Sequence, residues 1–453
     1  MSEYDLVIIG AGAAGSEAAF SIADGGRRRI LVAECEQFGG TCTNWGCVPT
    51  KALVRSAKIV HAARTGNEFG VQVSGVRVDW PRAIRRAWEL RDRMLRQGAA
   101  PFREAGIDVR IPARAVFTGE RELAVNGERV RARAVVVAAG LGPATPPIPG
   151  LAEAGCLDNR GVLSLPDLPR RLGVVGAGPI GSEFAQIFAR FGVQVTVLEA
   201  ADHVLPAEET ETGQAVKEAL AADGVDVRTS VSIESVERKA GGRRLHLAGG
   251  EWVEVDEILV ATGRVLDGEG LGLDAAGIEW SPQGIAVDDR LRTSRPWAWA
   301  AGDVVGDLLF THVADAMAGV AARNALLGTE ERIDLRVMPR VTFTDPEAAS
   351  VGLTESGARE AGHDVKVGFA PLADAEKAQI DGQTIGHVKV IADARTGEML
   401  GCHMVAETAG DMIHEAVVLM AARTPVKVGA DAIHAYPTLS QLMRTALGRA
   451  ALG

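Results

Sequence analysis

The sequence predicts an α/β fold that consists of two similar domains and a third, C-terminal α/β domain. The glycine pattern Gly10–Gly15 follows an apolar, β-branched run, and the same arrangement returns at Gly176–Gly181. A periodic apolar stretch follows each copy, which is typical of a buried parallel strand, a tight turn and a helix. From residue 337 onward, strand patterns such as 387–391 alternate with helix patterns such as 410–422, which predicts the third domain.

Each copy continues to a second strand that ends in an acidic residue, Glu34 in the first copy and Glu199 in the second. The glycines let backbone N–H groups and a helix N-terminus approach a pyrophosphate, and an acid at this spacing accepts a ribose hydroxyl. We therefore predict two Rossmann-like dinucleotide-binding domains, although either acid could instead be a solvated strand end. Because a carboxylate at Glu199 repels a 2′-phosphate, the second nucleotide is expected to be NAD rather than NADP.

The domain boundaries follow from turns and prolines. Each dinucleotide unit is expected to end in a strand and a small-residue turn, at 135–140 and at 258–263, and a stiff connector follows the first with Pro143, Pro146, Pro147 and Pro149. Helices are predicted over much of 50–65 and 80–105 and over 313–327. The predicted domains are 1–145 with 272–336, then 146–271, and finally 337–453.

The composition is that of an ordinary globular protein. Among 453 residues, 47% are hydrophobic and 24% are charged, which suits about two to four domains with cores of their own. The net charge of −11 is spread along the chain without a basic stripe, so neither nucleic acid nor an anionic membrane is expected as a partner. The chain enters a strand pattern directly after its first residues and holds no apolar run of about eighteen residues. A cytoplasmic protein is expected.

A close pair of cysteines lies directly before an expected helix. Four residues separate Cys42 from Cys47, and a ring this small constrains the unfolded chain too little to be a structural staple. Pro49 suits a first helical turn, so Cys47 would lie at the positive end of the helix dipole, which favours its thiolate. Lys51 follows Cys47 by four residues and would present its ammonium on the same face. These features predict a redox-active disulfide.

Two other interpretations of the pair are a zinc half-site and a buried structural thiol pair. Zinc needs two more ligands, usually a second close pair, whereas Cys35, Cys156 and Cys402 occur singly. No metal site is therefore predicted. Five cysteines are typical of a reducing compartment, in which a close pair is more often catalytic than structural.

Taken together, these motifs resemble those of the pyridine nucleotide-disulfide oxidoreductases, the class I flavoprotein disulfide reductases that include dihydrolipoamide dehydrogenase, glutathione reductase and mercuric reductase. The resemblance covers essentially the whole chain. It implies that the first domain binds FAD, that the second binds NAD, and that the third forms a homodimer whose active sites use both subunits. Besides the glycine units it rests on segments 39–51, 261–263, 301–303, 341–347, 351–355 and 434–439.

The resemblance also implies roles for individual residues. Cys42 would be the interchange thiol that attacks a substrate disulfide, and Cys47 the thiol that exchanges electrons with the flavin. Lys51 would lie beside the flavin and pair with Glu183, because a fixed cation stabilises charge on the reduced ring; Glu183 could instead be an acid on a helix surface. The implied FAD contacts are Gly10, Gly12, Ala14, Gly15, Glu34, Gly40, Thr41, Lys51, Ala139, Gly140 and Asp303, and the implied NAD contacts are Gly176, Gly178, Ile180, Gly181, Glu199 and Gly263.

The C-terminal motif departs from the family pattern. Disulfide reductases usually carry a His before the proline and a Glu five residues later, whereas this chain has Tyr436 and Gln441. Tyrosine, with an ordinary pKa near 10, is a poor base at neutral pH, and glutamine cannot orient an imidazolium by its charge. His434, two residues upstream, could take over the proton or be an ordinary structural histidine. Mercuric reductases also tend to carry Tyr at this position, but the tail 444–453 has no cysteine pair.

The sequence therefore predicts a homodimeric FAD enzyme that passes electrons between NAD(H) and a substrate through Cys42 and Cys47. A dihydrolipoamide dehydrogenase type that acts on a lipoyl group or a lipoyl-carrying protein is the first expectation. An NADH-driven reductase of metal ions, quinones or another disulfide is the second. A catalytically decayed flavin-binding scaffold is the third, although a scaffold has no physical need for the two cysteines, Lys51 and Glu199.

Overall fold

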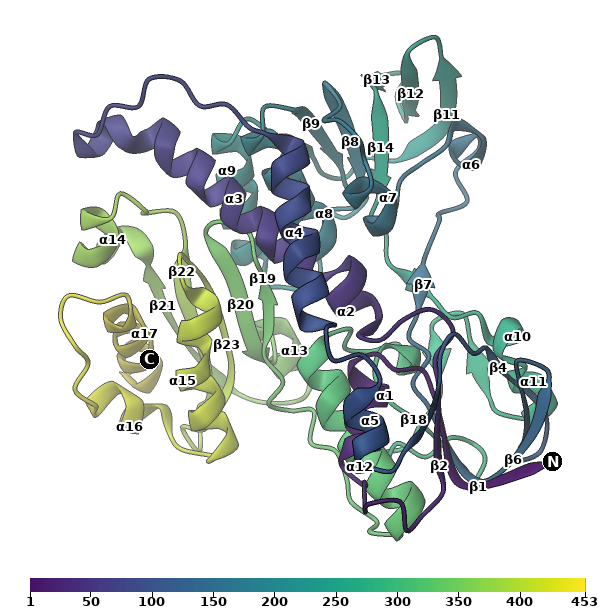
Figure 1. Cartoon of the computed structure of the whole chain (residues 1–453). Coiled ribbons are helices and arrows are strands. Elements are labelled where there is room, and N and C mark those ends of the chain that lie inside the picture. The colour runs from purple at the N-terminus through teal and green to yellow at the C-terminus, as the bar shows by residue number, and fades with distance from the viewer. Residues whose placement is uncertain (453) are drawn as a thin grey trace. The chain divides into compact units, whose positions relative to one another are not determined.

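The computed structural model describes residues 1–452 and divides into two compact units (Figure 1). The first unit consists of Met1–Ala52, Ile84–Ala144 and Gly263–Asp334. The second consists of Leu53–Ala83, Thr145–Thr262 and the chain from Leu335 onward. The three-domain division expected from the sequence stays a prediction.

A seven-stranded sheet forms the centre of the first unit. Its strand order is β3-β2-β1-β6-β5-β4, and β18 pairs with β6. β1 lies between β2 and β6, parallel to both, and its residues 6–8 are fully buried, as expected for a parallel strand covered on both faces. The strands are β1 (Ser2–Ile9), β2 (Ile30–Ala33), β3 (Asp108–Arg110), β4 (Ala115–Gly119), β5 (Glu122–Val125), β6 (Glu128–Val137) and β18 (Ala298–Ala300).

Helices α1 (Ala13–Phe20) and α12 (Thr311–Leu327) contact each other beside this sheet. α12 confirms the helix expected over 313–327, with two further residues at its start. The other elements in this unit are α2 (Gly40–Trp45), α5 (Ala100–Glu104), α10 (Gly268–Leu271), α11 (Leu273–Ala276), η2 (Asp303–Val305), β7 (Gly142–Pro143), β15 (Arg264–Val265), β16 (Trp280–Ser281) and β17 (Gly284–Ile285). Helices α3 (Cys47–Thr65) and α4 (Trp80–Met94) have residues in both units.

The second unit contains a four-stranded parallel sheet in the order β10-β9-β8-β14. It repeats the strand–turn–helix pattern of the first unit, since α8 (Pro179–Arg190) follows β8 directly after the second glycine turn. The strands are β8 (Arg171–Val175), β9 (Gln194–Leu198), β10 (Asp226–Arg228) and β14 (Glu257–Val260), and an antiparallel sheet contains β11 (Ile233–Lys239), β12 (Gly242–Leu247) and β13 (Trp252–Val255). The remaining helices are α6 (Leu151–Ala154), α7 (Asn159–Leu163), α9 (Thr210–Ala222) and η1 (Gly66–Phe69).

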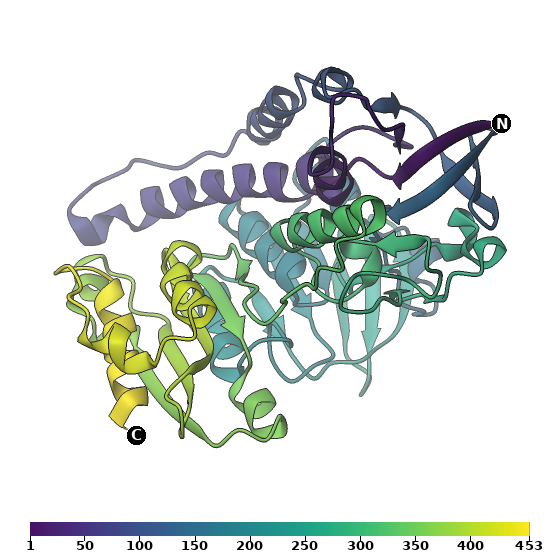
Figure 2. The same cartoon turned by 90° about the horizontal axis from the view of Figure 1, so that it is seen from below.

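The C-terminal part of the second unit is a five-stranded antiparallel sheet in the order β19-β20-β23-β22-β21. In Figure 2 the yellow helices lie beside its green to yellow-green strands, and α15 and α17 contact it directly. α15 confirms the helix expected over 410–422. The elements are β19 (Arg340–Thr342), β20 (Glu347–Gly352), β21 (Val365–Pro371), β22 (His387–Asp393), β23 (Met399–Ala406), α13 (Glu355–Glu360), η3 (Leu372–Asp374), α14 (Glu376–Ile380), α15 (Ala409–Ala421), α16 (Val426–Asp431) and α17 (Ser440–Leu452).

A buried ion cluster joins α9 to this C-terminal sheet. The ammonium of Lys389 on β22 lies 3.0 Å from Glu209, 2.9 Å from Glu211 and 3.1 Å from Glu355. Its hydrogen bonds to these carboxylates raise the pKa of Lys389 against the opposing effect of burial. A cation this deeply buried is tolerated because its partners compensate the lost hydration.

Among residues 1–452, no helix is long and apolar enough to cross a membrane.

His387 lies on the same strand, two residues before Lys389, and it is 3% exposed. Burial lowers its pKa to about 4, from an ordinary value of 6.5, and the charge of Lys389 acts in the same direction. The unfolded chain therefore binds a proton at this side chain between pH 6.5 and pH 4 while the folded chain does not. The folded state loses stability as the pH falls through this window.

We predict that His387→Gln flattens the decline of the unfolding free energy between pH 6.5 and pH 4, by up to about 3 kcal/mol in total. Urea unfolding at a series of pH values measures the decline. His246→Gln, at a more exposed position on β12, is the matched control and should leave it unchanged. An equally steep decline in His387→Gln and in the unaltered protein would contradict the assignment.

Candidate redox-active site

The two cysteines of the predicted disulfide lie at a break between two helices of the first unit. Cys42 lies in the short helix α2, and Cys47 is the first residue of α3. Gly46 separates the helices, and a Cβ atom there would approach the carbonyl oxygen of Thr41 to 3.0 Å. The sequence correctly placed Cys47 at the start of a helix, but it did not indicate that Cys42 has a helix of its own.

The surroundings of the pair make its two sulfurs unequal. A hydrogen bond to Cys47 and burial raise the pKa of the Cys42 thiol, while Thr311 and Lys51 act in the opposite direction. Cys47 is exposed and lies at the N-terminus of a helix of 19 residues, where the helix dipole favours an anion. This environment suits a pair in which Cys42 carries the proton and Cys47 the negative charge.

Thr311 is a neighbour of the pair that sequence reasoning missed. It is the first residue of α12, and its hydroxyl oxygen lies 3.6 Å from the Cys47 sulfur. The predicted helix began at Val313, so the hydroxyl had no role in that interpretation. Trp45, between the two cysteines, also contacts Trp88 of α4 edge to face, with ring centroids 5.6 Å apart.

The first glycine turn forms a cradle that fits a dinucleotide. Gly12 is the N-cap of α1 and makes no side-chain cap, so no capping side chain occupies the amides at this helix start, where an anion can bind. Gly40, at the start of α2, lies against Gly12 with φ +55, and a Cβ atom on it would come within 2.8 Å of the Gly12 Cα. The turn before the cysteines and the dinucleotide turn are therefore in backbone contact.

The second glycine turn has the same form. Gly178 is the N-cap of α8, without a side-chain cap, and a Cβ atom on it would meet nothing within 4 Å. Gly181, one turn into α8, allows the helix to approach the strand end, because a Cβ atom there would lie 2.0 Å from the Gly176 carbonyl oxygen. Open space at one glycine and close packing at the other are what a pyrophosphate at a helix N-terminus requires.

Both predicted ribose acceptors lie at the carboxyl ends of their strands and are largely buried. Glu34 accepts hydrogen bonds from the amides of Ala11 (2.7 Å) and Glu36 (2.8 Å). Glu199 accepts from Ala177 at 2.6 Å and from Ala201 at 2.8 Å. Each carboxylate thus holds its glycine turn in place, and each oxygen keeps a second lone pair for a ribose hydroxyl. The interpretation as a solvated strand end does not fit this burial.

Asp303, the predicted acceptor from FAD hydroxyls, begins η2 and forms an ion pair with Arg264. Burial raises the pKa of Asp303, and the guanidinium of Arg264 opposes that rise. Sequence reasoning missed Arg264, although its place directly after the turn at Gly263 was a usable signal. Arg264 lies on β15, which pairs with β7 in the same unit.

The other predicted contacts lie on the elements that the resemblance implied. Glu183 on α8 is 4% exposed and accepts a hydrogen bond from the amide of Phe343 at 2.9 Å, so it is not an acid on an exposed helix surface. Lys51 belongs to the first unit and Glu183 to the second, and their pairing stays a prediction. Ala14 lies in α1, Thr41 in α2, Ala139 and Gly140 after β6, Ile180 in α8, and Gly10 and Gly176 directly after β1 and β8.

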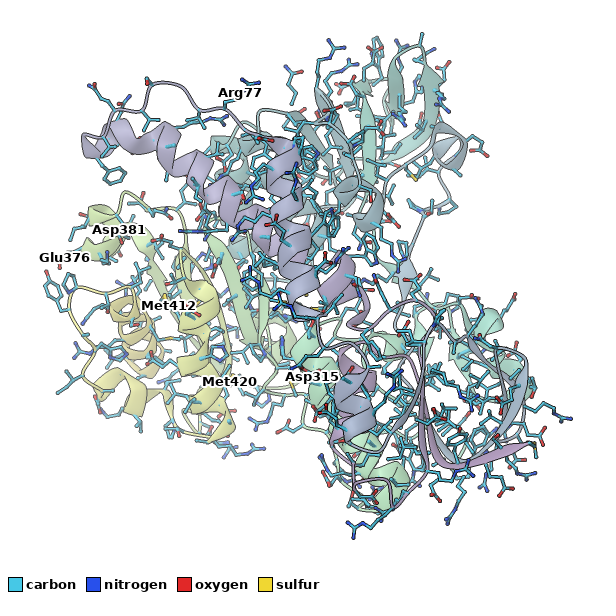
Figure 3. All side chains as sticks on the ribbon, viewed as in Figure 1. Arg77, Asp315, Glu376, Asp381, Met412 and Met420 are labelled. Carbon is cyan, nitrogen blue, oxygen red and sulfur yellow. The ribbon has the colours of Figure 1, made fainter. Side chains whose placement is uncertain are left out.

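The C-terminal motif holds its polar groups in an unusual arrangement. Tyr436 is 72% exposed, and a hydrogen bond to Glu376 raises the pKa of its hydroxyl; Glu376 is labelled in Figure 3, at the start of α14. His434 has an oxygen near each ring nitrogen, from Ala432 and from Glu415, both at 3.0 Å. Gln441 donates to the carbonyl oxygen of His434 at 2.9 Å instead of orienting an imidazole.

His434 is therefore anchored within its own protomer, and its role as a base stays a prediction. Among residues 1–452, no group of three or more His, Cys, Asp or Glu side chains is arranged to hold a metal ion.

Comparison with known proteins defines the class. Residues 4–318 match the model of the pyridine nucleotide-disulphide oxidoreductases, and residues 338–447 match the dimerisation domain of the same family. The chain belongs to this family, which confirms the predicted fold class. Enzymes of the class bind FAD and NAD(P), as the two glycine turns require, and the dimerisation domain supports a homodimer.

Individual relatives fall into more than one functional group. The chain is 34% identical to the mercuric reductase of Staphylococcus aureus over 449 residues, which cover 98% of this chain and 82% of that protein. It is 37% identical to the dihydrolipoyl dehydrogenase of Thermus scotoductus over 452 residues, which cover 97% and 96%. The Cu(II) complex of the HOCl-induced flavoprotein disulfide reductase RclA from Escherichia coli superposes with a TM-score of 0.87, at 32% identity and 99% coverage of each chain.

The contact between the two glycine turns can be tested through FAD retention. We predict that Gly40→Ala weakens FAD binding about tenfold or more, because its Cβ would displace the Gly12 backbone that faces the pyrophosphate. Gly25→Ala is the matched control, since Gly25 also has a positive φ (+72) but a Cβ atom there meets nothing within 4 Å. Flavin absorbance per protein after gel filtration measures retention, and equal loss in both variants would refute the cradle.

Proposed function

We propose that the protein is an NADH-dependent reductase that delivers electrons through Cys42 and Cys47 to a thiophilic metal ion such as Cu(II). The observation that carries the proposal is the C-terminal motif, where a neutral tyrosine and a glutamine stand in place of a histidine and a glutamate. The names of the S. aureus mercuric reductase and of the RclA Cu(II) complex support the same direction.

The residues of the site suggest which groups hold FAD, which sulfur carries the proton and which carries the negative charge. Bound FAD supplies two-electron chemistry between the nicotinamide and the cysteine pair. Glu34, Asp303 and the amides at the start of α1 are the groups that hold it. Two electrons and one proton open the disulfide, leaving a thiol on Cys42, whose pKa is raised, and a thiolate on Cys47 at the positive end of α3. Two Cu(II) ions then take one electron each, the S–S bond forms again, and the proton leaves Cys42.

The direction of the reaction follows from the missing base. Oxidation of a dithiol substrate requires a base that takes the thiol proton, and the Tyr436 hydroxyl is held in its protonated form by Glu376. Reduction of a metal ion makes no such demand, because thiolates bind the ion directly. A neutral hydroxyl can still donate a hydrogen bond or contact a soft ion.

NADH is the proposed electron donor rather than NADPH. Glu199 is 9% exposed and fixed by the amides of Ala177 and Ala201. A carboxylate held in this position accepts from a 2′-hydroxyl and repels a 2′-phosphate. Removing the negative charge of Glu199 would reduce the preference for NADH over NADPH.

Oxidation of dihydrolipoamide is the second candidate. The match to dihydrolipoyl dehydrogenases extends over 96–97% of several such proteins at 34–37% identity. In this case a lipoyl-carrying protein would have to supply the base that Tyr436 does not.

Anaerobic steady-state kinetics distinguish the candidates. We predict that NADH oxidation depends on Cu(II) with two Cu(I) formed per NADH, that NADPH is at least about tenfold less efficient, and that dihydrolipoamide yields NADH slowly. Cys42→Ser and Cys47→Ser should each lower kcat/KM for Cu(II) about a hundredfold or more, since either change removes the disulfide.

Cys156→Ser is the control, because Cys156 is a partly buried thiol outside the pair. Rapid dihydrolipoamide oxidation without Cu(II) reduction would overturn the proposal in favour of the second candidate. Unchanged Cu(II) reduction in Cys42→Ser would exclude the cysteine relay.

A further inference from the structure

The start of α12 places a hydroxyl group against the reactive sulfurs. Thr311 Oγ1 lies 3.6 Å from Cys47 Sγ, which is within hydrogen-bonding range for sulfur. The same hydroxyl also acts on Cys42, where its hydrogen bond lowers the pKa of the thiol. One side chain from a distant part of the sequence therefore faces both members of the pair.

Helix capping does not account for this threonine. The N-cap of α12 is Phe310, and Thr311 is the first helical residue, a position from which its side chain is not needed to close the helix start. No side-chain cap is formed at this terminus. The hydroxyl is directed toward the sulfurs, and the first turn of α12, a helix of 17 residues, contributes its positive end there as well.

A hydroxyl at this position distinguishes the oxidation states of the pair. A disulfide sulfur is a weak hydrogen-bond acceptor, whereas a thiolate accepts a charge-assisted bond that is about twice as strong as a neutral one. Any donor that contacts the thiolate therefore stabilises the reduced pair more than the oxidised pair.

We propose that Thr311 is a positioning residue that donates a hydrogen bond to the Cys47 thiolate and thereby stabilises the reduced cysteine pair. The proposal deepens the proposed function and rests on its assignment of Cys47 as the thiolate. When two electrons and one proton open the Cys42–Cys47 disulfide, the proton stays on Cys42, and the hydroxyl of Thr311 turns its hydrogen toward Cys47. When the electrons leave for the acceptor, the S–S bond forms again and the hydrogen bond is lost.

Other titratable groups of the first unit share this environment. Lys51, on α3, lowers the pKa of Cys42 through its charge. On α12 itself, His312 follows Thr311, and Asp315 lies one turn further along, where Figure 3 labels it. Burial and the charge of Glu17 raise the pKa of Asp315. A test must therefore change the hydroxyl and leave these charges in place.

The test uses the FAD-loaded full chain with Cys42→Ser, in which Cys47 is the remaining thiol of the pair. A thiolate beside a flavin gives long-wavelength absorbance, so its pH dependence reports the ionisation of Cys47. Adding Thr311→Val removes the hydroxyl and keeps the shape of the side chain. This change should raise the midpoint of the absorbance titration by about one pH unit. Thr311→Ser should restore it. Thr65→Val is the matched control, because the Thr65 hydroxyl bonds to the carbonyl oxygen of His61 instead.

An unchanged midpoint in Thr311→Val, or equal shifts in the Val and Ser variants, would overturn the proposal. A shift in Thr65→Val as large as that in Thr311→Val would do the same. Absence of the long-wavelength band in Cys42→Ser itself would count against the proposed function, since Cys47 would then lie away from the flavin. In that case the same variants are compared by the pH dependence of iodoacetamide alkylation at Cys47, located by mass spectrometry, which needs no flavin and judges Thr311 independently.

Discussion

The position of one sulfur at the start of α3 is the constraint on which the proposed redox site depends. Cys47 occupies the first position of a long helix, and Cys42 lies in a separate short helix where burial and its neighbour keep it protonated. A relay requires this asymmetry, because one sulfur must exchange electrons as an anion while the other meets the substrate as a thiol or in a disulfide. Gly46 creates the asymmetry by ending α2 before α3 begins.

The first glycine turn lies directly against the helix that holds Cys42. A Cβ atom on Gly40 would come within 2.8 Å of the Gly12 Cα, and Gly40 is the first residue of the helix that holds Cys42. The first glycine turn and the helix that holds Cys42 are therefore in backbone contact. Buried Glu34 holds the turn in place by accepting the amide of Ala11. The second turn repeats this design with Glu199 and Ala177.

Much of this arrangement could be predicted from the sequence because its signals are local. The glycine turns, the acids at the strand ends and the helix start at Cys47 each depend on residues within one supersecondary unit. Thr311 and Glu415 could not be found in this way, since each contacts a residue outside its own local motif. The anchoring of His434 by Glu415 shows the same limit: the sequence showed a histidine near the motif but not that both ring nitrogens have acceptors.

The departure at the C-terminal motif is the feature on which the proposed direction of the reaction depends. A histidine at this position can take up the thiol proton near neutral pH, whereas a hydrogen bond to Glu376 raises the pKa of the Tyr436 hydroxyl. The electron relay itself needs neither group. Anaerobic titration of the FAD-loaded protein with NADH, with new thiols counted and located by mass spectrometry, tests that relay most directly. The account predicts that NADH generates two thiols, at Cys42 and Cys47, and that Cys47→Ser generates none; flavin reduction without any new thiol would contradict it.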